Sequence, residues 1–299
     1  MLRPHALRVF VAVADCGNIR DAAAQLGRTV SAVSMTLKQL EDRIGAPLFE
    51  ADRKHTLTPL GTEVRKLARD LLREHDRTME RITAIATGQE GVLRIAAVPS
   101  VAAQLLPAVL TEMLARQPGV QIELLDTDTP SVHALVAGGE VEIGIAGKPG
   151  PARDLEFMPL FNDPFRLVCR RDHPLAAATA PLRWQDLQGH RLISNKSTTD
   201  FATADDARLR AASALSARNM ISLLALVGAG AGVTILPGLA TRSMQPDLCS
   251  MALADRAALR TVGFILRQKN TPSPISTAFQ RRFRKMIATS GLVSVTAAP

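Results

Sequence analysis

The sequence predicts a chain of three parts: an N-terminal helical domain with a helix-turn-helix and a small β-wing, a long connecting helix, and a C-terminal α/β domain. Three observations lead to this fold class. Apolar residues recur at helical spacing near the N-terminus, residues 62–87 contain neither Gly nor Pro, and short strand-like runs alternate with helical segments from Val92 onward. With 299 residues and 46% hydrophobic composition, the chain can bury the cores of two or three compact units.

Apolar spacing and capping residues predict the first helices. Leu7 and Phe10 fall about one helical turn apart and indicate a first helix. Asn18 is a favourable N-cap for a second helix, because its side chain accepts a hydrogen bond from a free backbone N–H. Gly27 is expected to end that helix, since glycine readily adopts a positive φ. Thr29 is expected to cap a third helix.

Small and β-branched residues predict that the second and third helices form a helix-turn-helix. Such a motif needs a small residue where its helices cross, a glycine in its turn and a β-branched residue on the inner face of its second helix. Ala23, Gly27 and Val33 meet these needs, and Leu37 and Leu40 continue the inner face. An ordinary helical hairpin is the alternative. The front end and outer face of the third helix comprise Arg28, Thr29, Val30, Ser31, Ser34, Met35 and Lys38.

The next segment predicts a wing. Residues 51–61, ADRKHTLTPLG, are typical of two short strands that carry Arg53 and Lys54, followed by a helix capped by Thr58 or Thr62.

The run AAAQLGRTVSAVSMTLKQLEDRIGAPLFEADRKHTLTPLG resembles the winged helix-turn-helix of LysR-type transcriptional regulators. The small residues, Leu26, AVS, LE, the IG-PLFE run and LTPLG occur in the family's order. The family commonly has Gln-Pro at the start of its recognition helix and Arg after AVS, where this chain has Val30, Ser31 and Met35. It also often has Arg after PLFE, where this chain has Ala51. The resemblance therefore implies the fold, whereas the family's usual base contacts do not carry over.

The DNA contacts are instead expected from side-chain chemistry. Val30 is suited to a thymine methyl group, and Ser34 and Lys38 to phosphates. Arg53 or Lys54 is expected to reach the minor groove from the wing.

Residues 62–87 predict a long helix that needs a partner. Six basic and five acidic residues surround an apolar stripe, and an apolar stripe is stable when another helix covers it. A homodimer is the natural interpretation, and the family resemblance implies the same; packing on its own domain is the alternative. The stripe consists of Val64, Leu67, Leu71, Leu72, Met79, Ile82 and Ile85.

The C-terminal two-thirds predict a parallel sheet with helices on both faces. VLRIAAV, VQIELL and VEIGIAG are strand-like and alternate with helices, which is βαβ order. The PLF-(x)4-LV run, DHPLA, DLQGHRLI and GFILR resemble the family's effector-binding domain. This resemblance implies a periplasmic-binding-protein-like fold of two α/β lobes between which the chain crosses twice. The expected lobes are residues 92–163 with 264–299, and residues 164–263.

Several features argue against an enzyme. In LVGAGAGVTILP (226–237) the glycines follow a predicted helix and precede a strand, the reverse of a phosphate-binding loop. The same glycines interrupt the only long uncharged segment, so no membrane span is expected. His173, in a DHPL turn, is expected to form a hydrogen bond with the local backbone, and no catalytic set is visible.

Cys16, Cys169 and Cys249 are far apart in sequence and lack metal-like spacing, so reduced thiols and no metal site are expected.

Net charge is +8, but the excess lies at the C-terminus, where residues 264–299 hold six Lys and Arg and no Asp or Glu. The solvated face of a terminal helix explains this excess, so the DNA prediction rests on the motif.

Polar residues that follow predicted strands suggest where an effector binds. In open α/β domains, ligands bind at the carboxyl ends of strands, often between lobes. Several of these residues fall at helix N-termini, which favour anions, so a small carboxylate or similar anion is the expected effector. Caps and turn residues are the alternative for each. The expected effector-binding residues are Ser100, Thr129, Ser131, Lys148, Ser194, Asn195 and Asn219.

The sequence thus predicts a cytoplasmic, effector-controlled transcriptional regulator that binds double-stranded DNA as a homodimer or homotetramer and requires no cofactor. The expected domains are residues 1–60 (DNA-binding), 61–90 (connecting helix) and 91–299 (effector-binding). A small-molecule binding protein that dimerises through its N-terminal helices, without a DNA function, is the alternative.

Overall fold

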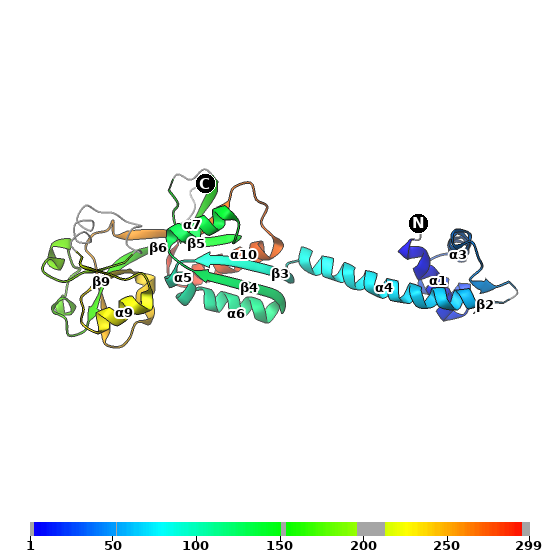
Figure 1. The fold of residues 1–299 in the computed structure, drawn as a ribbon, viewed down its shortest axis with the longest axis horizontal. Coiled ribbons are helices and arrows are strands. Elements are labelled where there is room, and N and C mark those ends of the chain that lie inside the picture. Colours follow the sequence, from blue (N-terminus) through cyan, green and yellow to red (C-terminus); the bar gives the residue numbers. More distant parts are fainter. Residues whose placement is uncertain (1–2, 52, 151–153, 196–212, 295–299) are drawn as a thin grey trace. The chain divides into compact units, whose positions relative to one another are not determined.

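The structure is a computed structural model that describes residues 3–51, 53–150, 154–195 and 213–294 (Figure 1). The chain divides into two compact units, residues 1–84 and residues 85–299, each with a buried apolar core. Within the described ranges, no helix is both long enough and apolar enough to cross a bilayer.

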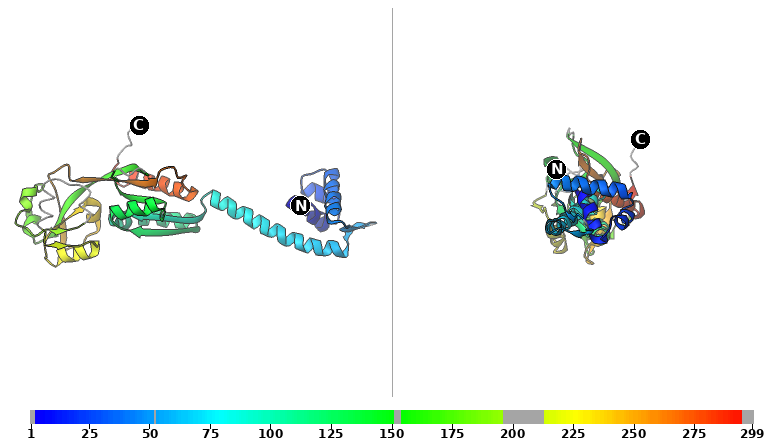
Figure 2. Two further views of the ribbon diagram at one scale, coloured as in Figure 1. Left: turned by 45° about the horizontal axis from the view of Figure 1, so that its top comes forward. Right: turned by 90° about the vertical axis from the view of Figure 1, so that its right-hand side faces the viewer.

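The first unit is mostly helical. Its described elements are α1 (Pro4–Cys16), α2 (Ile19–Gln25), α3 (Val30–Ile44), β1 (Phe49–Glu50), β2 (Arg53–Leu57) and α4 (Pro59–Ala86), the last of which continues into the second unit. β1 and β2 pair antiparallel and form the predicted wing. α4 is one uninterrupted helix, as the absence of Gly and Pro from residues 62–87 predicts (Figure 2).

The predicted caps are confirmed. The side chains of Asn18 and Thr29 accept hydrogen bonds from the amides three residues further on, at 2.8 and 3.3 Å, at the starts of α2 and α3. Gly27 has φ +62° in the turn between these helices, a conformation that favours glycine. Of the two candidates for the next cap, Thr58 accepts from the amide of Gly61 at 2.9 Å, at the start of α4.

The core of the first unit holds the helix-turn-helix together. Val33, Leu37 and Leu40 are buried, so the predicted inner face of α3 is confirmed. Phe10 of α1 and Phe49 of the wing meet edge to face, with ring centroids 5.5 Å apart, and connect the wing to the helices.

The second unit is an α/β structure in which short helices and 3-10 turns alternate with strands. Its described elements are β3 (Glu90–Ala97), α5 (Pro99–Gln104), α6 (Leu106–Arg116), β4 (Gly119–Asp126), α7 (Thr129–Gly138), β5 (Ile143–Gly147), β6 (Leu155–Arg170), η1 (Pro174–Ala177), η2 (Trp184–Leu187), β7 (Ile193–Ser194), β8 (Leu215–Ser216), α9 (Met220–Gly228), β9 (Thr234–Pro237), η4 (Gly238–Ser243), β10 (Leu248–Ala252), β11 (Leu259–Arg267), α10 (Pro274–Thr289) and β12 (Val293–Ser294).

The predicted parallel pairing is confirmed for β3, β4 and β5, but the complete sheet is mixed. β3 pairs parallel with both β4 and β5, while β11 and β6 add antiparallel to β5. α7 and α6 lie on opposite sides of these strands (Figure 1), and every residue of β5 is buried. Layers on both faces explain why β5 is apolar and buried along its whole length, whereas the edge strand β4 buries only Val120.

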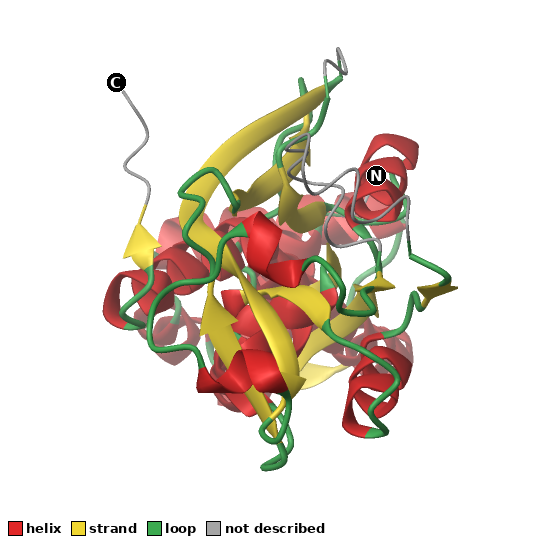
Figure 3. Ribbon diagram, turned by 90° about the vertical axis from the view of Figure 1, so that its left-hand side faces the viewer, coloured by secondary structure: helices red, strands yellow, loops and turns green. Residues whose placement is uncertain are grey.

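Two long strands connect the parts of this unit. β6 pairs with β11 along its first half and with β9 and β10 along its second half. Figure 3 draws the strands in yellow and the helices in red, and a long curved strand is visible among them. One apolar core gathers around β3 and β5, and two others lie around β9 and the second half of β6. This arrangement gives two lobes joined by strands.

The glycine-rich stretch joins a helix to a strand, as predicted. α9 ends at Gly228, Gly230 has φ +76°, and β9 begins at Thr234. A Cβ on Gly232 would lie 2.3 Å from the carbonyl oxygen of Arg191, so only glycine fits beside that backbone. These glycines therefore serve a tight turn and close packing.

Candidate DNA-binding and effector sites

The outer face of α3 is open to solvent. Val30 is 49% exposed and Met35 is 61% exposed, and both are large apolar side chains that a soluble helix would ordinarily bury. Ser31 and Lys38 are exposed, and Ser34 is half-buried. The inner face of α3 is therefore buried and aliphatic, and its outer face is exposed apart from the half-buried Ser34.

The remaining predicted DNA-binding residues flank this face. Thr29 caps the helix, and its hydroxyl lies 3.2 Å from that of Ser31. Arg28 is exposed directly before the helix. Arg53 and Lys54 lie in β2 of the wing, but their side chains are outside what the structure describes.

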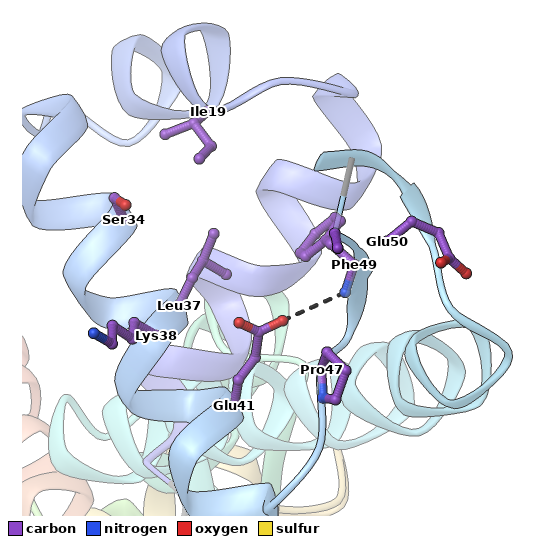
Figure 4. A pocket seen from close by; sticks show the side chains of 9 residues that line it. Ile19, Ser34, Leu37, Lys38, Glu41, Pro47, Phe49 and Glu50 are labelled. Atoms are coloured by element: carbon purple, nitrogen blue, oxygen red, sulfur yellow. Dashed lines mark hydrogen bonds between the residues drawn. The ribbon is translucent and has the colours of Figure 1, made fainter. Parts of the chain in front are cut away.

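A hollow of about 310 Å³ separates α3 from the wing (Figure 4). Ser34 and Lys38 line it from α3, and Glu50 lines it from β1. Glu41 holds the wing in place, because its carboxylate accepts hydrogen bonds from the amides of Leu48 (2.7 Å) and Phe49 (3.4 Å). In the sequence, the pair Leu40-Glu41 served only as part of the family resemblance, so this role of Glu41 in positioning the wing was missed.

Sequence reasoning also missed a second, basic hollow of about 180 Å³ beside α3. Arg3 and His5 from the start of α1 meet Arg28 and Arg43 there, and no acidic residue lines it. The signal was hidden because these four residues lie on separate parts of the sequence, where the charge count for residues 1–60 is nearly balanced. The hollow lies along Thr36, Gln39 and Arg43, a different side of α3 from its exposed outer face, and Arg28 is its one member among the predicted DNA-binding residues.

α4 is attached to the helix-turn-helix by ion pairs. The Asp15 carboxylate accepts hydrogen bonds from Arg65 and Arg69 at 2.5–2.9 Å, and Arg8 pairs with Asp76 at 2.5 Å. Burial raises the pKa of Asp15, but the hydrogen bonds from Arg69 and Arg65 outweigh it and leave that pKa below its usual value. The first half of α4 is therefore held at defined positions.

Much of the predicted apolar stripe on α4 is uncovered. Leu72 is buried and Val64 packs against the core, as the alternative of packing on the chain's own domain requires. The other members are between 48% and 66% exposed; these are Leu67, Leu71, Met79, Ile82 and Ile85. The stripe thus has a short inner part and a longer unpartnered part among the described residues.

Four predicted effector-binding residues follow adjacent strands of the sheet. Ser100, Thr129 and Lys148 come after β3, β4 and β5, whose carboxyl ends are neighbours in the register. Lys148 is exposed. The N-terminus of α7 is already capped, because Asp128 accepts from the amide of Ser131 at 3.0 Å.

The other three belong to the second lobe. Ser194 ends β7, and the side-chain Nδ2 of Asn195 donates to Thr234 Oγ1 (3.1 Å) and to the carbonyl oxygen of Ile235 (2.9 Å). Asn219 caps α9 by accepting from the amides of the residues two and three further on. Asn195 and Asn219 thus have structural roles of the kind expected of caps and turn residues.

Ser100 belongs to a buried network that sequence reasoning did not find. Its hydroxyl accepts a hydrogen bond from Arg260 at 2.6 Å, and Arg260 pairs with Asp163 at 2.9 Å. Asp163 also accepts from the amide of Leu239 at 2.9 Å. The network joins α5, β6, β11 and η4 through buried side chains. Single-sequence patterns give no signal for it because its members are far apart in the chain.

Comparison with known proteins shows which protein family has these domains. Residues 4–62 match the bacterial regulatory helix-turn-helix protein, lysR family, and residues 86–288 match the LysR substrate binding domain. The chain belongs to the LysR family. It is a LysR-type DNA-binding transcriptional regulator with an effector-binding domain, and regulators of this family are not enzymes.

Individual relatives agree with this assignment. The chain is 29% identical to the HTH-type transcriptional regulator YbhD of Escherichia coli K12 over 91% of this chain and 88% of the relative. It is 32% identical to the HTH-type transcriptional regulator YfeR of Shigella flexneri over 78% of each chain. Full-length CbnR in complex with its target DNA has the same fold, with a TM-score of 0.73 and 22% identity, covering 96% of this chain and all of that one.

The prediction of a LysR-type regulator with DNA, a small-molecule effector and further copies of itself as partners is therefore confirmed. The alternative of a binding protein without a DNA function is not favoured, because the helix-turn-helix of this LysR-type regulator matches the family's DNA-binding domain.

Proposed function

We propose that this regulator reads an interrupted palindromic DNA site through the exposed face of α3 and that a small anion controls its activity. The observation that carries the first half is the division of α3 into a buried inner face and an uncovered outer face. The proposed DNA-contacting residues are Arg28, Thr29, Val30, Ser31, Ser34, Met35, Lys38, Arg53 and Lys54.

The proposed effector site lies in residues 91–299, among polar groups at the ends of strands. We propose that this domain has a first lobe of residues 92–163 and 264–299 and a second lobe of residues 164–263. Lys148 supplies an exposed positive charge directly after β5, which supports an anionic effector. The buried hydroxyl of Ser100 accepts a hydrogen bond from Arg260, so its own O–H can donate to an anionic effector without displacing that contact. The proposed contacts are Ser100, Thr129, Ser131, Lys148, Ser194, Asn195 and Asn219.

The proposed dimer forms through the connecting segment, residues 61–90, following a DNA-binding domain at residues 1–60. The uncovered apolar side chains of α4 need a partner helix, and a second copy of α4 presents the same stripe. Two copies place two α3 helices on one DNA site, which is why a palindrome is proposed. We place the regulator in the cytoplasm because its DNA target lies there.

A gel-shift experiment with the DNA upstream of this regulator's own gene tests the DNA half. Retardation at moderate salt supports the proposal, and folded protein that leaves the fragment unretarded contradicts it.

A thermal-shift screen of small carboxylates on the full chain, each paired with its neutral amide, tests the effector half. We expect a carboxylate to stabilise the protein and its amide to have no effect. Lys148→Gln should weaken that binding roughly 10-fold because a charged hydrogen bond is lost, while Lys269→Gln serves as a matched control. Stabilisation by neutral compounds alone would contradict the anionic assignment.

A further inference from the structure

Two cysteines that are 80 residues apart in sequence lie side by side in the fold. Cys169 of β6 and Cys249 of β10 are direct partners in an antiparallel pair of strands, and their Sγ atoms are 3.7 Å apart. All three cysteines are free thiols in the structure, as the sequence predicts, but the strand order brings Cys169 and Cys249 together, which their separation in sequence did not indicate.

The backbone around the pair has dimensions that suit a disulfide. The amide of Arg171 donates to the carbonyl oxygen of Asp247 at 2.9 Å, so these two residues form a hydrogen-bonded pair. Opposed pairs alternate along an antiparallel ladder, so Cys169 and Cys249, two positions away, are also a hydrogen-bonded pair with Cα atoms about 5.5 Å apart. That separation is the commonest one for disulfides.

The two sulfur atoms differ in access. Both side chains belong to the apolar cluster formed by β6, β9, β10 and the η1–η2 segment, where Cys169 is buried and Cys249 is half-buried. Burial and the adjacent Cys249 thiol raise the pKa of Cys169 to about 12, so it is a neutral thiol at physiological pH. Both thiols are free in this structure, and a small reagent reaches the more exposed Cys249 first.

We propose that Cys169 and Cys249 are a site of reversible disulfide formation driven by small hydroperoxides. The Cys249 sulfur attacks the peroxide, the O–O bond breaks, and the products are a sulfenic acid at Cys249 and an alcohol or water. The Cys169 sulfur then attacks the Cys249 sulfur, the S–O bond breaks, and water leaves with the Cys169 proton. Both sulfurs are oxidised by one electron each, the peroxide is reduced by two, and a dithiol reductant reverses the change by thiol–disulfide exchange.

The proposed disulfide would link the edge strand of the sheet covalently to its neighbour. β10 is an edge strand that pairs with β6, and the disulfide closes a loop of residues 169–249. Closing a loop of this length restricts the unfolded chain, so the oxidised protein should unfold roughly 5–10 °C above the reduced protein.

Thiol titration and mass spectrometry of the full chain test the proposal. The reduced protein is treated with hydrogen peroxide, alkylated and digested with trypsin without reductant. We expect free thiols to fall from three to one per chain and a cross-linked pair of peptides, residues 167–170 with residues 243–256, to appear at two hydrogens below their summed mass. Dithiothreitol should restore all three thiols and the lower melting temperature.

Variants make the outcome specific. Cys16→Ser should retain the cross-link and leave no free thiol after oxidation, because Cys16 lies in the other unit, while Cys249→Ser should abolish the cross-link. Cys249 is half-buried, so serine is tolerated there more readily than at Cys169. The proposal is overturned if the folded, oxidised protein keeps three free thiols, or if its cross-links join Cys16 or two separate chains.

Discussion

At the scale of single residues, α3 contains two valines with opposite roles. Val33 is buried in the core of the first unit, and Val30 is 49% exposed. Val33→Ala should lower the free energy of unfolding by about 2 kcal/mol, because buried methyl groups are lost and a cavity remains. Val30→Ala should change it by less than about 0.5 kcal/mol and instead weaken DNA binding. Denaturant unfolding of both variants checks this, and equal losses of stability would contradict the assignment of faces.

His173 has the structural role that its DHPL turn predicts. Its Nδ1 accepts a hydrogen bond from the amide of Leu175 at 3.2 Å, and its ring lies 4.9 Å from that of His190. Burial and the neighbouring His190 lower the pKa of His173, although Asp172 opposes the shift. Unfolded His173 therefore binds a proton more readily than folded His173, so stability should decrease as the pH falls below about 6.5.

Melting temperatures between pH 8 and pH 5 test the titration. His173→Asn keeps an acceptor at the cap but does not titrate, so its melting temperature should decrease less steeply over this range than that of the unchanged chain. Identical slopes would assign the pH dependence to other groups.

Residue roles could be predicted where their cause is local. The caps at Asn18 and Thr29 follow from the chemistry of the next three residues, and the structure confirms them. The Arg260–Asp163 pair and the contact of Cys169 with Cys249 depend on which strands become neighbours, and no local pattern encodes that.

At the scale of elements, the attachment of α4 rests on Asp15. Its carboxylate faces Arg65 and Arg69, and all three side chains are about a third to a half exposed. Exposed ion pairs contribute little individually, so Asp15→Asn should lower stability by about 1 kcal/mol or less. A double-mutant cycle of Asp15→Asn with Arg69→Met measures the coupling, and an additive result would show that the contact contributes nothing.

The types of the elements could be predicted from the periodicity of apolar residues, whereas a local irregularity in β6 could not. The helix–glycine–strand order of residues 226–237 and the parallel β3, β4 and β5 follow from pattern alone. β6, however, contains Pro159 and Pro164 within a paired strand, which disfavours a regular ladder. A register shift opposite Val262 and Gly263 leaves Leu160 as an extra residue, and this bulge accommodates the strand beside β11.

At the scale of the whole molecule, the exposed stripe of α4 predicts the assembly. Met79 and Ile82 are 48% and 53% exposed, and a second α4 would bury them. Met79→Glu combined with Ile82→Glu should shift the protein toward monomer in analytical ultracentrifugation and weaken binding to a palindrome more than binding to a half-site. The exposed polar positions Thr78 and Thr83 give a control pair, Thr78→Glu with Thr83→Glu. An unchanged sedimentation coefficient in the first pair would place the dimer interface elsewhere.

DNA affinity of matched charge variants tests the role of α3 most directly. Ser34→Glu with Lys38→Glu changes the net charge by −1 and −2, a total of −3, and Lys285→Glu with Ala288→Glu makes the same change on exposed positions of α10. In anisotropy titrations with the regulator's own upstream DNA, the α3 pair should lose on the order of 100-fold in affinity, while its melting temperature and effector binding stay unchanged. The α10 pair should bind nearly as well as the unchanged chain. Equal affinities for the two folded variants would contradict the assignment of α3 as the DNA-reading helix.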